Sequence, residues 1–111
     1  MPIFNEADML ENVSGDTECV QMIVNSFYND LSMGFPELKQ ALADHNERQS
    51  RDICHTLGGA SGTTCSPLLA KDFENISKAV KTANWREALL AYDVAEKNFG
   101  LVTLEIKKYL E

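Results

Sequence analysis

The sequence is short of positive charge and contains no long apolar run. Its 111 residues include 10 Lys and Arg against 17 Asp and Glu, which gives a net charge of −7 at pH 7. We therefore expect neither nucleic acid nor an anionic membrane surface as a partner, because both attract clustered positive charge. No apolar stretch approaches the roughly 18 residues of a transmembrane helix. The first residues lack the basic and apolar regions of a signal peptide, so we expect a cytoplasmic protein.

Cysteine is also scarce, and its spacing is irregular. Cys19, Cys54 and Cys65 do not form the even, patterned set of a disulfide framework, and we expect all three to be reduced. Adjacent side chains on a helix point about 100° apart, so Cys54 and His55 are badly placed to share a metal ion or to act as a nucleophile pair. The sequence has no Cys-x-x-Cys or His-x-x-x-His pair either, and we expect no metal site.

The alternation of apolar and polar residues that marks a β-strand is lacking over any useful length. Apolar residues instead recur every three or four positions, which is the spacing of helices that bury one face. The pattern predicts an all-α protein with a single domain over 1–111, namely an antiparallel up-and-down four-helix bundle with a short additional N-terminal helix. We expect helices over 5–11, over 16–42 with a kink at Pro36, from Asn46 to about Cys65, from Ser66 to about Ala83, and from Asn84 onward.

Start signals and heptads support these helices. Asn46 with Gln49, and Asn84 with Glu87, match capping boxes, and Ser66 precedes a proline at the first helical position. The last helix carries the heptad Trp85, Tyr92, Phe99 and Ile106, with Ala88, Ala95, Val102 and Tyr109 between them. An intermolecular coiled coil is the alternative to a bundle. Because only this helix has the strict pattern, we favour the bundle and expect a monomer.

The candidate site lies in the helical segment 51–62. Placed on a helix, His55 lies opposite the expected core face, and the residues three, four and seven positions after it are Gly58, Gly59 and Gly62. Each interior glycine costs about 1 kcal/mol relative to alanine, so three on one face point to the close approach of something large. We expect the core face of this helix to contain Ile53, Leu57, Ala60 and Thr64.

A histidine imidazole is largely neutral at cytoplasmic pH, and its ring nitrogen can attack phosphorus. Residues 48–86, which include His55, hold six basic and three acidic residues, whereas residues 1–47 hold nine acidic and one basic. This basic middle segment is either an ordinary solvated surface or a local site for an anion. We expect no function for His45, which lies in a turn.

The run His55-Thr56-Leu57-Gly58-Gly59-Ala60-Ser61-Gly62 resembles the signature of histidine-containing phosphotransfer (HPt) domains of bacterial phosphorelays. Their pattern is roughly His-x-Leu-Lys-Gly-[Ala/Ser]-[Ala/Ser]. The resemblance implies a four-helix bundle whose exposed histidine, here His55, accepts a phosphoryl group from a phospho-aspartate on a receiver domain and passes it to another. It implies receiver domains and a hybrid sensor kinase as partners. It also implies a phosphotransfer intermediate rather than an enzyme, without cofactor, since Mg²⁺ belongs to the receiver.

Two positions depart from the HPt pattern. The lysine three residues after the histidine is Gly58 here, and the glycine ten residues after it is Cys65. Arg51 and Lys71 are candidates to support the phosphoryl charge instead, as are Lys78 and Arg48, and Ser77 falls where family members often carry a polar contact to the site. The alternatives are a degenerate domain that binds a receiver without efficient transfer, and a purely structural or partner-binding bundle.

Overall fold

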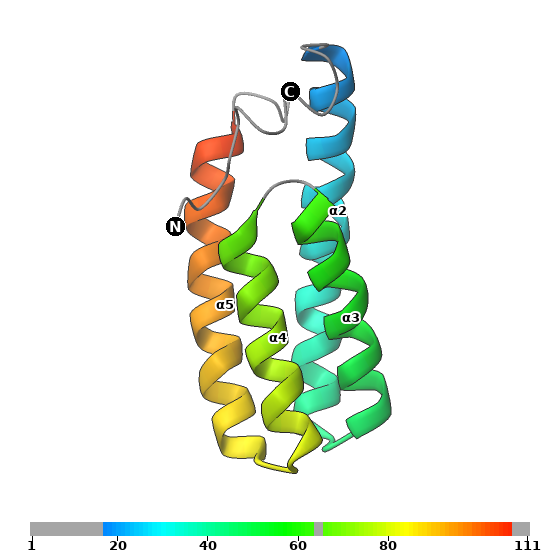
Figure 1. Ribbon diagram of the computed structural model, residues 1–111, viewed down its shortest axis with the longest axis vertical. Helices are drawn as coiled ribbons and strands as arrows, with labels where there is room; N and C mark the ends of the chain where they lie inside the picture. Colours follow the sequence, from blue (N-terminus) through cyan, green and yellow to red (C-terminus); the bar gives the residue numbers. More distant parts are fainter. Residues whose placement is uncertain (1–16, 64–65, 108–111) are drawn as a thin grey trace.

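The chain folds into four helices packed side by side. A computed structural model describes residues 17–63 and 66–107 (Figure 1). The helices are α2 (Thr17–Ala43), α3 (Glu47–Thr63), α4 (Pro67–Lys81) and α5 (Trp85–Ile106). The short helix expected over 5–11 lies outside the described residues, as does Cys65.

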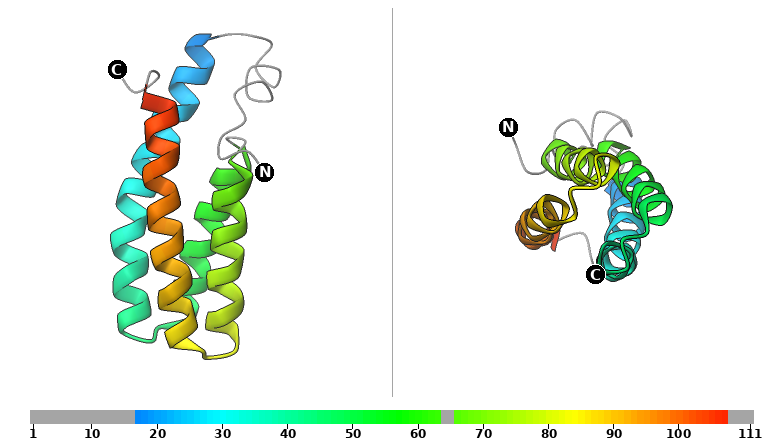
Figure 2. Two further views of the ribbon diagram at one scale, coloured as in Figure 1. Left: turned by 90° about the vertical axis from the view of Figure 1, so that its left-hand side faces the viewer. Right: turned by 90° about the horizontal axis from the view of Figure 1, so that it is seen from below.

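The helices run alternately up and down and close into a ring. Each one packs against two neighbours, in the pairs α2–α3, α3–α4, α4–α5 and α5–α2, and the view along the bundle shows this order (Figure 2). Short turns join α2 to α3 and α4 to α5, which makes the consecutive helices antiparallel. The all-α, up-and-down bundle predicted from the apolar spacing is therefore confirmed.

Most of the core comes from the apolar stripes that the sequence predicted for α2, α4 and α5, and Cys54 and Leu57 of α3 complete it. Tyr92 is buried in the core, and its hydroxyl lies within hydrogen-bond distance of the Glu96 carboxylate, at 2.9 Å, and of the Phe35 carbonyl, at 3.2 Å. Trp85 and Phe99, from the same heptad, are partly buried against the core. The buried stripe residues are Val20, Val24, Phe27, Leu31, Leu38, Leu42, Leu69, Phe73, Ile76, Val80, Ala88, Ala95, Val102 and Ile106.

α2 passes through Pro36 as one helix, as predicted. Close packing against α3 occurs at Gly34, where an added Cβ would lie 2.7 Å from Cδ1 and 2.8 Å from Cδ2 of the buried Leu57 side chain. Real Cβ atoms do not approach other carbons so closely, so a side chain at position 34 would force the buried Leu57 side chain to shift. At this point α2 and the candidate-site helix α3 pack closely against each other.

The turns after α2 and α4 have the same backbone conformation. In each, a residue in the left-handed region follows the helix end, His45 with φ 53° and Ala83 with φ 57°, and two backbone bonds close the turn. An asparagine then begins the next helix: the Asn46 and Asn84 side chains accept hydrogen bonds from the backbone N–H groups of Gln49 and Glu87. These two predicted caps are confirmed. Ala83 was wrongly assigned to the fourth helix, which ends at Lys81.

Ser66 occupies the predicted N-cap position of α4, with Pro67 at the start of the helix. Its side chain makes no capping hydrogen bond. The predicted N-cap position is therefore confirmed, but the side chain does not cap the helix.

The predicted core face of α3 needs a correction. The buried residues are Ser50, Cys54, Leu57 and Ser61, whereas Ile53 and Ala60 are only partly buried and Thr64 lies outside the described residues. The buried face is therefore turned by about one residue from the predicted one. The prediction counted large apolar side chains, but the small side chains of Ser50 and Ser61 fit the close approach of the neighbouring helices.

Candidate functional site

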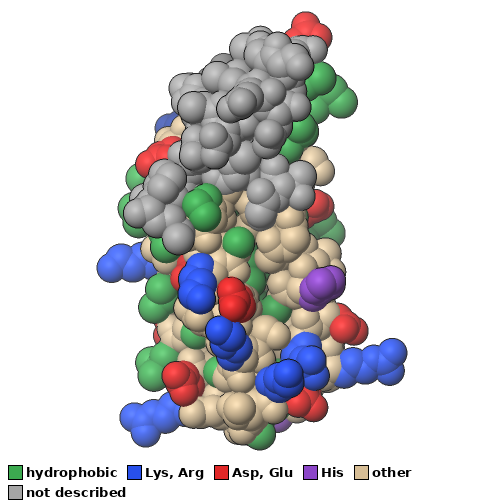
Figure 3. Space-filling model, viewed as in Figure 1, with side chains coloured by type: hydrophobic (Ala, Val, Ile, Leu, Met, Phe, Trp, Pro, Cys, Tyr) green, Lys and Arg blue, Asp and Glu red, His purple; other side chains and the backbone are tan. Residues whose placement is uncertain are grey.

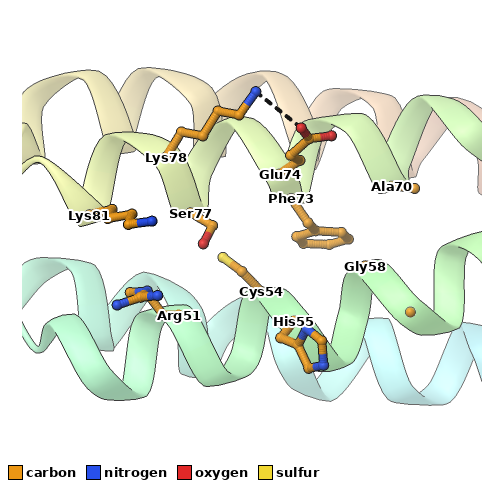
Figure 4. Close-up of a pocket in the computed structure, with 11 residues that line it drawn as sticks. Arg51, Cys54, His55, Gly58, Ala70, Phe73, Glu74, Ser77, Lys78 and Lys81 are labelled. Atoms are coloured by element: carbon orange, nitrogen blue, oxygen red, sulfur yellow. Dashed lines mark ion pairs between the residues drawn. The ribbon is translucent and has the colours of Figure 1, made fainter.

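His55 lies on α3 beside a groove of about 420 Å³ that runs between α3 and α4. Its side chain is exposed, as predicted. The two helices contribute opposite walls. In Figure 4, Phe73 and Ser77 of α4 and Cys54 of α3 point into the space between the helices, whereas the His55 imidazole points away from α4. The groove is lined by Arg51, Cys54, His55, Gly58 and Gly59 from α3 and by Ala70, Phe73, Glu74, Ser77, Lys78 and Lys81 from α4.

Cys54 and His55 point in different directions from neighbouring positions of the helix (Figure 4). Cys54 is only 2% exposed, and burial raises the pKa of its thiol to about 12. The thiol is therefore protonated at neutral pH and is not an activated nucleophile or metal ligand. In the described part of the chain, no group of three or more His, Cys, Asp or Glu residues could hold a metal ion.

The glycines beside His55 are not required by packing among the described residues. A Cβ at Gly59 would meet no atom within 4 Å beyond its own helix backbone, and one at Gly58 would make an ordinary contact of 3.6 Å with the Phe73 Cβ. Alanine would fit at both positions, in contrast to Gly34. Gly62 belongs to α3, but its surroundings lie outside the described residues.

The charged residues of the groove divide into paired and unpaired groups. Glu74 forms ion pairs with Lys78, at 3.0 Å, and with Lys71, at 3.7 Å. The hydrogen bond from Lys78 and the charge of Lys71 hold the pKa of the Glu74 carboxyl below its ordinary value. Within residues 17–63 and 66–107, neither Arg51 nor Lys81 has a carboxylate within the 4.0 Å of an ion pair.

Several Lys and Arg side chains lie on the face of the molecule that α3 and α4 form (Figure 3). They gather over the lower half of this surface, with a few Asp and Glu side chains among them. The net charge of −7 therefore describes the molecule as a whole, while the groove beside His55 has three cations and one carboxylate in its lining.

The structure brings together most of the predicted site. His55, Gly58, Gly59, Arg51 and Ser77 all line the groove, with Ser77 half-buried on α4. Lys71, the other predicted phosphate-supporting residue, is not part of the lining and pairs with Glu74.

Sequence reasoning did not single out Lys81 or Glu74. The signal that finds them is helical spacing, because Glu74 precedes Ser77 by three residues and Lys81 follows it by four, which places all three on one face of α4.

Comparison with known proteins adds no relative: no protein-family model matches the chain, and neither curated proteins nor solved structures give a significant match. None of the helices in the described residues is long and apolar enough to cross a membrane.

Proposed function

We propose that this chain is a histidine phosphocarrier of a phosphorelay. His55 accepts a phosphoryl group from the phospho-aspartate of a receiver domain and passes it to an aspartate of another receiver. The observation that carries the proposal is the surface beside His55, where Gly58 and Gly59 occupy helical positions that would accommodate alanine.

Two interior glycines cost a helix about 2 kcal/mol relative to alanine. Packing explains this cost at Gly34, where a Cβ would overlap Leu57, but not at Gly58 or Gly59. Both lie one turn after His55, so they clear the surface over which a folded partner would approach the imidazole. The approach of a bulky reaction partner explains the glycines at positions 58 and 59, whereas helix packing within the bundle does not.

The reaction needs little from this chain beyond presentation of the imidazole. The lone pair of His55 Nε2 attacks phosphorus, the N–P bond forms as the P–O bond to the aspartate breaks, and the electron pair leaves with the aspartate carboxylate. The proton on Nδ1 stays on the ring. Mg²⁺ and most stabilisation of the transition state belong to the receiver domain. The carrier contributes an accessible, correctly oriented nucleophile.

The electrostatics of the groove suit this role. A phosphohistidine carries up to two negative charges, and the groove beside His55 offers Arg51, Lys78 and Lys81. As a carrier, the chain would act in the cytoplasm as a phosphotransfer intermediate, with receiver domains and a hybrid sensor kinase as its partners.

A second candidate function is a domain that binds a receiver but transfers phosphate poorly. Gly58 favours this second function, because the HPt motif has a lysine at that position and this chain has a glycine there instead. The cleared surface would then serve docking alone.

Phosphorylation with a labelled donor separates the two. Incubation with labelled, phosphorylated receiver domains is expected to place an acid-labile, base-stable label on the wild type and on His45→Asn, and none on His55→Gln. His45→Asn is the matched histidine control, because asparagine tolerates the positive φ at position 45. A label on His55→Gln, or no label on the wild type with any receiver of a broad panel, would overturn the carrier function.

A further inference from the structure

The groove beside His55 lacks the lysine of the HPt motif. The cations that do line it differ in whether they form an ion pair with a carboxylate. Glu74 neutralises Lys78, whereas Arg51 and Lys81 line the groove without a carboxylate within 4.0 Å in the described part of the chain. We propose that Arg51 and Lys81, one from each wall, form an anion subsite that holds the phosphoryl group on His55. This inference rests on the proposed function of His55.

The position of Arg51 suits a phosphoryl group on His55. Arg51 precedes His55 by four residues on α3, so the two side chains are neighbours on one face, with Cβ atoms roughly 5–6 Å apart. Its guanidinium has five N–H donors in a planar fork, which can bind two phosphoryl oxygens at once. The side chain is exposed, so it can turn toward the phosphoryl group without breaking an ion pair.

Lys81 completes the subsite from the opposite wall. Figure 4 shows Arg51 on α3 and Lys81 on α4 at opposite walls of the groove, on the same side of Ser77. A lysine is a flexible point charge with three N–H donors, and it can reach an anion whose position another residue fixes. The two cations together would balance a doubly charged phosphoryl group.

Lys78, the third cation of the groove, already has an anionic partner. Its Nζ lies 3.0 Å from Glu74 Oε1, and the side chain extends toward Glu74 and away from α3 (Figure 4). To reach the phosphoryl group, Lys78 would have to exchange this carboxylate for it. Because Glu74 pairs with Lys78, Arg51 and Lys81 are the cations of the groove lining that are left to bind the phosphoryl group.

A pH titration by ³¹P NMR tests the subsite without a protein partner. Phosphoramidate serves as the donor: its P–N bond breaks, ammonia leaves, and the phosphoryl group moves to His55. Cations beside the phosphoryl group favour its doubly charged form, so in Arg51→Gln and in Lys81→Met the titration is expected to move to higher pH. Hydrolysis of the phosphohistidine is expected to be about two- to fivefold faster, the range that exposed ion pairs support.

Lys97→Met, an exposed cation on α5, is the matched control and is expected to titrate like the wild type. Circular dichroism confirms that each variant folds. If phosphohistidine forms at residue 55 but Arg51→Gln and Lys81→Met titrate as the wild type does, the subsite is wrong and the carrier function stands. A larger shift in Lys78→Met than in both of them also overturns the subsite. If no signal is lost in His55→Gln, the proposed nucleophile itself is wrong.

Discussion

Gly59 lies one helical turn beyond His55, and a Cβ at that position would meet no atom within 4 Å beyond its own helix backbone. Among residues 17–63 and 66–107, nothing therefore fills the space over this turn of α3. Glycine at this position lowers the stability of the helix, and packing among the described residues does not require it. The absence of a side chain instead leaves room for a partner that approaches His55.

Substitution of Gly59 is expected to separate stability from transfer. Gly59→Ala should raise the free energy of unfolding by about 1 kcal/mol, because alanine is the better helix former and has room. Gly59→Lys should fold and yet block transfer from a receiver, because its side chain covers the approach to His55. Urea unfolding and receiver-to-carrier transfer measure the two effects. Gly100→Ala, at an equally open position on α5, should gain the same stability without any change in transfer. Full transfer to Gly59→Lys would show that the cleared surface has another cause.

The opposite sign is expected at Gly34. A Cβ there would lie 2.7 Å from Leu57 Cδ1, and Leu57 is only 3% exposed and has little freedom to move. Overpacking costs about 1–3 kcal/mol, against a helix-propensity gain of about 1 kcal/mol, so Gly34→Ala should lower the free energy of unfolding by up to about 2 kcal/mol. Denaturant unfolding beside Gly59→Ala measures the contrast. Stabilisation by both substitutions would mean that α2 and α3 are not held together at Gly34.

Ser50 offers a stabilising substitution away from the groove. Its side chain is fully buried, and among the described residues its hydroxyl has no hydrogen-bond partner. A buried hydroxyl that lacks a partner costs about 1–3 kcal/mol. Ser50→Ala should therefore raise the free energy of unfolding by about 1 kcal/mol or more. Ser61→Ala is the comparison, because the Ser61 hydroxyl donates to the Leu57 carbonyl at 2.8 Å. A loss of stability in Ser50→Ala equal to that in Ser61→Ala would show that Ser50 has a partner after all.

Asp72 is expected to make stability depend on pH. It is 6% exposed, and burial raises the pKa of its carboxyl, an effect that the hydrogen bond from Asn98 at 2.8 Å partly offsets. The folded state thus favours the protonated acid, so this residue's contribution to stability falls as the pH rises from the unfolded-state pKa through the raised one.

Asp72→Asn removes that penalty and keeps an oxygen that can accept from Asn98. The variant should be more stable than the wild type at pH 7, and the difference should shrink as the pH falls below the raised pKa. Thermal unfolding across the acidic range measures this trend. A difference that grows toward low pH would contradict it.

The fold was largely predictable because α2, α4 and α5 each carry enough apolar residues at helical spacing to define their buried faces. The stripe on α2 from Val20 to Leu42 is buried where the spacing placed it. Of the heptad on α5, Tyr92 and Ile106 are buried and Trp85 and Phe99 partly buried, while Tyr109 lies outside the described residues. α3 is the exception, since its buried face includes Ser50 and Ser61, and serines carry no hydrophobic signal. Their burial depends on how closely the neighbouring helices approach, which is a tertiary property.

The site was predictable on α3 and less so on α4. His55, Arg51 and the glycines belong to one helix, where sequence distance fixes the angle between side chains. The α4 wall depends on the rotation of a second helix about its own axis. That rotation follows from the burial of the whole apolar stripe of α4. It brings Ser77 and Lys81 to the groove and leaves Lys71 outside its lining.

The most direct test of the central claim is to follow the phosphoryl group itself. A receiver domain phosphorylated with acetyl phosphate is mixed with the chain, and ³¹P NMR with peptide mass spectrometry at neutral pH locates the phosphorus. Phosphohistidine at residue 55 is expected to appear as the receiver's phospho-aspartate disappears, in equal amounts at early times. Loss of the phospho-aspartate to inorganic phosphate alone, at a rate that the chain does not change for any receiver of a broad panel, would contradict phosphotransfer through His55.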